Sequence, residues 1–134
     1  MMSSLIIHDL PSGDETIVLE TDLLIEAPNW TPDGAALIVN GDGRLFHVPL
    51  DRPALVAIDT GFATRLNNDH GISPDGSMLV ISYHTVIGQS CIYTLPSGGG
   101  EPRRVTANTP SWWHGWSPDG RTIFVTALNA NRVA

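Results

Sequence analysis

Trp30-Thr31-Pro32-Asp33-Gly34 recurs twice in this chain, as Ile72-Ser73-Pro74-Asp75-Gly76 and Trp116-Ser117-Pro118-Asp119-Gly120. Successive copies begin 42 and 44 residues apart. Proline presets the backbone angle at the second turn position, aspartate bonds back to nearby backbone groups, and glycine accepts the left-handed conformation that closes the turn. Each copy therefore predicts a tight turn between two strands. Because the aspartate recurs at one turn position, we expect it to be structural in all three copies.

An apolar run follows each of these turns, at Leu37-Ile38-Val39, Met78-Leu79-Val80-Ile81 and Ile123-Phe124-Val125. Residues of these types favour strands. The runs are continuous rather than alternating, which predicts strands buried on both faces.

A second turn motif lies between the first ones. Leu10-Pro11-Ser12-Gly13 recurs as Leu95-Pro96-Ser97-Gly98, and Val48-Pro49-Leu50-Asp51 has the same phase. Strand-like residues flank all three sites, so each unit contains four antiparallel strands, as in a β-propeller blade. The predicted fold is all-β with three blades' worth of strands, divided into a partial blade 1–24, a blade 25–66, a blade 67–107 and a partial blade 108–134.

The composition of the chain limits which classes of molecule it is expected to bind. Fourteen acidic and seven basic residues give a net charge of -7, which disfavours nucleic acid because a phosphate backbone would be repelled. The short apolar run near the amino terminus, Leu5-Ile6-Ile7, is too small for a secretion signal or a membrane span, so we expect no membrane partner and a cytoplasmic location. The single cysteine, Cys91, lies in a strand-like segment, and we expect a buried, unreactive thiol.

The repeated turn resembles that of the TolB-like β-propellers, which are usually six-bladed. The likeness includes Asn68-Asp69-His70 before one turn and Trp113-His114-Gly115-Trp116 leading into the next. Family members are about twice as long, which implies that this chain supplies half of a six-bladed ring. Two alternatives follow: two copies associate into one ring as a homodimer, or the chain is a truncated piece of a longer protein.

Propeller channels are lined by the first strand of each blade, which here runs into each Pro-Asp-Gly turn. Motif spacing aligns Pro28, His70 and His114 and predicts that the two histidines lie side by side at the channel. The candidate ligand-binding residues are Asn68, Asp69, His70, Trp112, Trp113 and His114. They are suited to a protein, a small polar ligand or a sugar, and two imidazoles with a carboxylate also suggest a divalent metal. The competing interpretation is that these groups only satisfy hydrogen bonds along the channel strands.

Three classes of function remain. The leading class is a TolB-like binding or interaction module without a cofactor, since TolB itself is a protein-interaction component of a cell-envelope system. The alternative is a channel-site enzyme, a lyase or lactonase on carbohydrate-like substrates, which would use His70, His114 and a metal. The last class is a propeller that controls access to a peptidase, as in the prolyl oligopeptidase group, but no catalytic domain or common hydrolase motif is visible.

Overall fold

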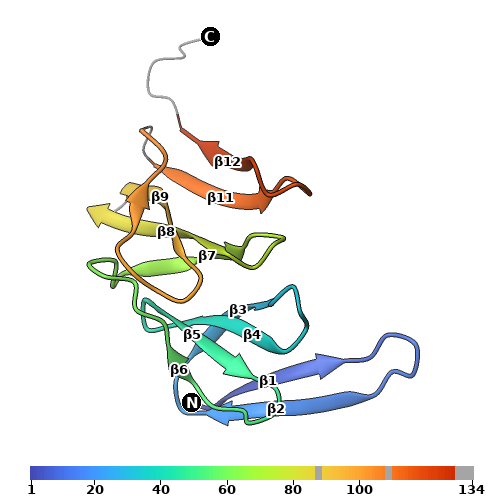
Figure 1. The fold of residues 1–134 in the computed structure, drawn as a ribbon. Helices are drawn as coiled ribbons and strands as arrows, with labels where there is room; N and C mark the ends of the chain where they lie inside the picture. Colours follow the sequence, from blue (N-terminus) through green and yellow to red (C-terminus); the bar gives the residue numbers. More distant parts are fainter. Residues whose placement is uncertain (87–88, 108–109, 129–134) are drawn as a thin grey trace.

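The computed structural model describes residues 1–86, 89–107 and 110–128, and the secondary structure of this part is entirely β (Figure 1). The strands are β1 (Ser3–His8), β2 (Glu15–Thr21), β3 (Ile25–Trp30), β4 (Ala36–Gly41), β5 (Arg44–Pro49), β6 (Val56–Ala57), β7 (Leu66–Ile72), β8 (Met78–Val86), β9 (Gln89–Pro96), β10 (Arg103–Arg104), β11 (Ser111–Trp116) and β12 (Ile123–Ala127). Among the described residues there is no helix long and apolar enough to cross a membrane.

These strands form two complete and two incomplete blades. Strands β3-β4-β5-β6 make one four-stranded antiparallel sheet, and β7-β8-β9-β10 make another. Two-stranded sheets, β1-β2 and β11-β12, lie at opposite ends of the stack in Figure 1. The expected four-stranded antiparallel blade is therefore confirmed, and the sheets do not close into a ring.

Each Pro-Asp-Gly turn is held by its aspartate. In the middle copy, the hydroxyl of Ser73 donates to the Asp75 carboxylate at 2.5 Å, and the Ser77 backbone N–H donates to the same oxygen at 3.0 Å. These bonds lower the pKa of Asp75 to about 2, with the Ser73 bond as the largest cause. Asp33 and Asp119 make the equivalent bonds in their own turns. The structural role expected for the three aspartates is confirmed.

The hydrophobic core lies between blades rather than inside any one of them. One cluster joins the two complete blades and includes Ile38, Leu79 and the fully buried Cys91. Another joins β1-β2 to the next blade and includes Leu5 and Leu37. Neighbouring residues of β4 thus pack in opposite directions, which explains why every residue of this strand is buried.

The last strand differs from the sequence expectation. The run in β12 was predicted to be buried on both faces, but Phe124 is 60% exposed, whereas its counterpart Val80 is fully buried. The reason is that burial of a blade face requires a neighbouring blade. Among the described residues, no blade follows β11-β12.

Candidate functional site

Each of the innermost strands of the blades has an irregularity in its pairing shortly before its Pro-Asp-Gly turn. Strands β3, β7 and β11 each leave their regular pairing a few residues before the Pro-Asp-Gly turn, between Glu26 and Asn29, between Leu66 and His70, and between Trp113 and Gly115. In β3 the cause is local: Pro28 has no N–H for the ladder, and Ala27 before it has a φ of +52°, unusual for a residue other than glycine. Such bulges free side chains from regular alternation and redirect them.

The bulges separate the two candidate histidines. His70 pairs with Ile81 in the ladder, but the equivalent pair in the next blade joins Trp113 to Val125, and His114 lies in the bulge. The predicted placement of His70 and His114 at one level is therefore wrong. The extra residue in the bulge moves His114 out of the ladder and gives Trp113 the position that His70 has in the preceding blade.

His70 is enclosed between blades rather than open to the channel, with only 2% of its surface exposed. Its Nε2 lies 3.3 Å from Nδ2 of Asn29 and 3.4 Å from the carbonyl oxygen of Ile38, both on the preceding blade. The Asn29 amide also donates to the His70 carbonyl at 3.2 Å. Burial lowers the pKa of His70, and this effect is partly offset by the carbonyls of Ile38 and Asn68. The ring is thus held mainly neutral as a packing group.

Trp113 plays the corresponding part in the next interface. A Cβ built at Gly71 would lie 2.1 Å from the tip of the Trp113 ring, so the indole lies directly against the Gly71 backbone. The Trp113 backbone N–H donates to the hydroxyl of Ser82 at 3.3 Å, while its indole nitrogen is buried without a partner among the described residues. This side chain is half-buried and joins β11 to the preceding blade.

The remaining candidates are more accessible. Asn68 and His114 are exposed, while Asp69 and Trp112 are half-buried. Burial raises the pKa of the Asp69 carboxyl, and the charges of His114 and His84 oppose that rise. The Asp69 carboxyl of β7 is therefore influenced by the imidazoles of His84 on β8 and His114 on β11, near the inner edge of the blades. No set of three or more His, Cys, Asp or Glu side chains within residues 1–86, 89–107 and 110–128 could hold a metal ion.

A pocket of about 540 Å³ lies between the two complete blades beside this edge. Its polar lining comes from both blades, and Asn40 crosses between them by donating to the Asn67 carbonyl at 2.9 Å. The lining residues are Leu23, Leu24, Glu26, Asn40, Asp42, Gly43, Leu66, Asn67 and Asn68. Of these residues, only Asn68 was predicted from the sequence as a candidate ligand-binding residue. Glu26 was missed, although its distance from the turn motif equals that of Asn68 and would have identified it.

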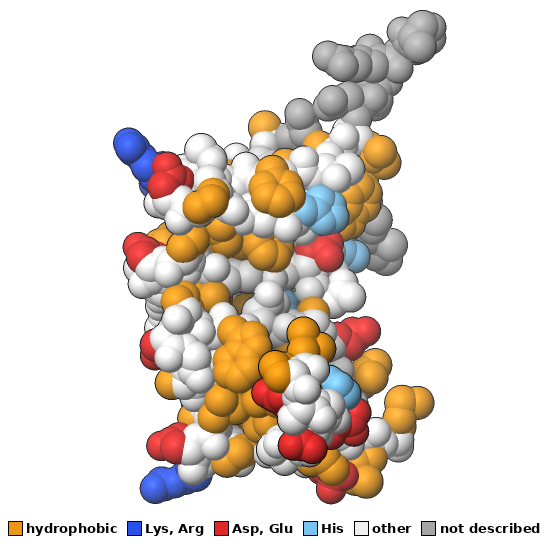
Figure 2. All heavy atoms as spheres, turned by 90° about the vertical axis from the view of Figure 1, so that its right-hand side faces the viewer, with side chains coloured by type: hydrophobic (Ala, Val, Ile, Leu, Met, Phe, Trp, Pro, Cys, Tyr) orange, Lys and Arg blue, Asp and Glu red, His pale blue; other side chains and the backbone are white. Residues whose placement is uncertain are grey.

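A second pocket, of about 510 Å³, lies between the same blades near the Pro-Asp-Gly turns. The turns project to the right in Figure 1, and Figure 2 views that side. Asp33 and Asp75 border this pocket, with Ile38 and Ile72 among its apolar residues. Hydrophobic and acidic side chains are spread over this face, and arginine side chains are confined to its edge (Figure 2).

The chain resembles several known proteins, although no family model matches it. An uncharacterized protein of Agrobacterium fabrum is 50% identical over 124 residues, which are 92% of this chain and 42% of that protein. The structure of a TolB candidate from Agrobacterium tumefaciens has a TM-score of 0.90 and 47% identity, covering 94% of this chain and 46% of that one.

More distant structures share the fold. TolB from Acinetobacter baumannii has a TM-score of 0.75 at 23% identity, over 92% of this chain and 32% of its own. The tricorn protease has a TM-score of 0.62 at 17% identity, over 87% of this chain and 12% of its own. The chain thus spans less than half the length of each of these four proteins. With its repeated turns and four-stranded blades, the chain is a TolB-like β-propeller chain of about half the usual length.

Proposed function

We propose that this chain is a binding module of the TolB-like type, with its ligand site at the inner edge of the blades around Asn68, Asp69 and His114. The observation that carries the proposal is the bulge shared by the three inner strands. Bulges turn polar groups out of the ladder, where they are free to contact a ligand. Ring geometry places the same level of successive blades around one channel.

The charge of this edge indicates what it would bind. Glu26 and Asp42 line the adjoining pocket, and Asp69 lies beside it on the same strand as Asn68. A carboxylate that is partly removed from water gains from a cationic or hydrogen-bond-donating ligand, because such a partner replaces the lost solvation. We therefore expect a ligand with exposed positive charge, such as a basic peptide segment of a protein partner. Trp112, half-buried on β11, is an aromatic candidate for stacking on it.

The alternative, a carbohydrate lyase or lactonase that uses His70 and His114, has less support. An acid or base must reach its substrate within hydrogen-bond distance. His70 is 2% exposed and packed against Asn29 and Ile38, so its imidazole faces protein. Enzyme chemistry would have to rely on His114 without the second histidine.

The proposed function includes completion of the propeller ring by further blades. The chain matches 46% of a TolB candidate at a TM-score of 0.90, and its four sheets contain the strands of three blades. A ring would place the inner edges around one channel and cover the open blade faces. We propose that association with a further set of blades supplies this ring.

Calorimetric titration tests the binding site with defined probes: a lysine- and arginine-rich peptide, an acidic peptide of equal length, and a neutral oligosaccharide. We expect the basic peptide to bind preferentially, and more weakly as salt increases. Replacing Asp69 with Asn should weaken binding of the basic peptide by at least about tenfold, since a hydrogen bond to a charged group contributes about 1.5–3 kcal/mol. The matched control is Asp51→Asn, which removes the same charge from an exposed loop residue. Equal binding of all probes, or equal losses in the two variants, would contradict the proposed site.

A further inference from the structure

Each incomplete sheet has one strand that lacks, among the described residues, the ladder partner that its counterpart has in a complete blade. In the complete blades, the second strand pairs with the third: β4 with β5 and β8 with β9. The strand β12 is a second strand, because the Trp116 to Gly120 turn precedes it, and it pairs only with β11. The strand β1 is a third strand, because the Leu10 to Gly13 turn follows it, and it pairs only with β2. Each of the two lacks the kind of neighbour that the other could provide.

Exposure at equivalent positions also indicates a missing neighbour. Leu10, two residues beyond the end of β1, is 87% exposed, while Val48 and Leu95, at the same motif position in β5 and β9, are 0% and 1% exposed. On the second strand, Phe124 is 60% exposed and its counterpart Val80 is fully buried. Full burial of a large apolar side chain contributes about 1.5–3 kcal/mol, so covering these residues would be strongly favourable.

We propose that β12 of one molecule pairs with β1 of a second copy of this chain, and that β1 of the first pairs with β12 of the second. This inference rests on the proposed completion of the ring and names the partner. The two edges lie at opposite ends of the blade stack, so they cannot meet within the observed arrangement of one molecule (Figure 1). Two identical halves form two identical seams, which is two-fold symmetric closure into six blades.

The complete blades specify the register of this seam. Leu79 pairs with Leu95, and transfer by motif position places Ile123 opposite Leu10. One pair further along, the same transfer places Val125 opposite His8. The seam would then be an antiparallel ladder. The neighbouring blades of the two copies would cover the exposed apolar residues on the faces of the completed sheet.

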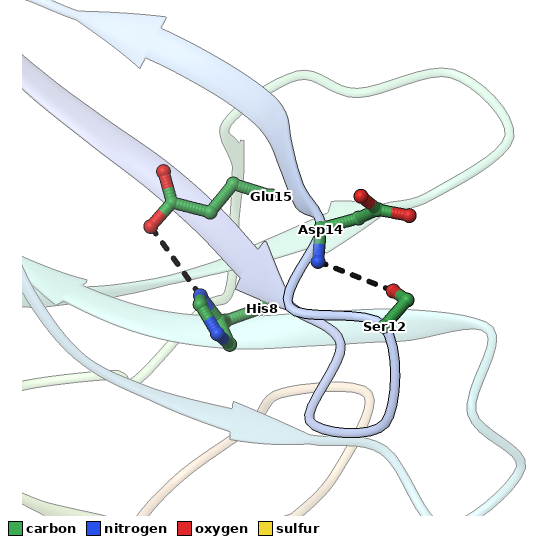
Figure 3. A network of polar contacts seen from close by, with 4 residues as sticks. All are labelled: His8, Ser12, Asp14 and Glu15. Carbon is green, nitrogen blue, oxygen red and sulfur yellow. Dashed lines mark hydrogen bonds and ion pairs between the residues drawn. The ribbon is translucent and has the colours of Figure 1, made fainter.

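Charge favours the same pairing. Exposed Arg121 lies two residues before the start of β12, and this register places it beside the turn that joins β1 to β2. That turn is acidic. Figure 3 shows the Asp14 carboxylate directed away from the contacts around it, whereas Glu15 is engaged by His8 at 3.3 Å between oxygen and Nδ1. Asp14 is therefore available to an arginine from a second copy.

Disulfide trapping in the full chain tests the seam at residue level. His8→Cys combined with Val125→Cys places both thiols at one expected ladder pair, close enough for a disulfide after mild oxidation. The matched control combines His8→Cys with Phe124→Cys, since a shift of one residue directs the second side chain to the other face. The native Cys91 is fully buried and is present in both variants. Light scattering of the unmodified chain at several concentrations measures its mass without any substitution.

The expected result is a dimer by mass, with a covalent dimer that forms several-fold more in the register pair than in the control. A folded monomer, an open series of larger species, or equal trapping in both variants would overturn the second copy as partner. Assembly only with another protein that supplies the missing blades would also overturn the second copy as partner. Peptide titration of each species separates the two proposals: loss of the dimer with retained Asp69-dependent binding contradicts only the seam, and a trapped dimer that ignores the basic peptide contradicts only the binding site.

Discussion

Replacing Gly71 with Ala should destabilise the chain by forcing two blades apart. Gly71 is buried in β7, and its added methyl carbon would lie 2.1 Å from the nearest atom of the Trp113 ring and 2.7 Å from the next. Carbon atoms at van der Waals contact are about 3.5–4.0 Å apart, so the ring or the β7 backbone must move by more than about 1 Å. The contact joins two blades, so the strain is expected across their interface.

The expected cost follows from two opposing effects. Overpacking a well-packed interior costs about 1–3 kcal/mol, and so close a contact places this substitution near the upper end. Alanine restricts the unfolded chain more than glycine does, and this effect adds about 0.4–1 kcal/mol to the free energy of unfolding. The net loss in the free energy of unfolding should therefore be about 1–2.5 kcal/mol.

Denaturant unfolding, followed by tryptophan fluorescence and by circular dichroism, measures this loss. Gly98→Ala is the control, because an added Cβ there meets no atom within 4 Å and its backbone is not left-handed. Trp113→Phe removes the part of the ring that would clash, so Gly71→Ala should cost at least about 1 kcal/mol less in that background. The packing argument fails if Gly71→Ala and Gly98→Ala are equally stable, or if Trp113→Phe leaves the cost unchanged.

Three further predictions concern buried or charged groups. Since burial lowers the pKa of His70 below 6.5, its contribution to stability is present above that pH and declines as pH falls; this decline should be smaller in His70→Gln by urea unfolding at several pH values. For Asp75, with a pKa of about 2, the contribution is present above about pH 3.8 and is lost as pH falls toward 2; Asp75→Asn should flatten that acid transition in thermal melts, whereas Asp51→Asn should retain it. Cys91, fully buried, should react with a thiol reagent only when the chain opens, and immediate labelling of the native chain would contradict its observed packing.

Local chemistry explains why much of the fold could be predicted. A Pro-Asp-Gly turn is specified by its own atoms, and in the structure Gly34, Gly76 and Gly120 all have the positive φ that the motif implies. The spacing of these turns and the β-type residues between them predict four-stranded blades, which the structure confirms. Turn geometry and strand preference depend on interactions within a few residues, so both can be predicted from the amino-acid sequence.

The candidate site was less predictable, because ladder register is not a local property. His70 and His114 have the same distance from their turn motifs, yet one is buried between blades and the other is exposed. A bulge moves a side chain from one face of a strand to the other without a distinct change in composition. In the blade that contains His114, the bulge brings Trp113 into the interface instead, against the small surface of Gly71.

The Leu-Pro-Ser-Gly motif separates what the sequence determines from what the tertiary structure decides. Both copies form the turn between two strands, yet Leu95, at the end of β9, is 1% exposed and Leu10, two residues beyond β1, is 87% exposed. The sequence alone determined the turns, the strands and the blade repeat, because their causes lie in neighbouring residues. Only the tertiary structure decided which side chains are covered, because a blade face becomes a core when another blade packs against it, and that contact joins residues far apart in the chain.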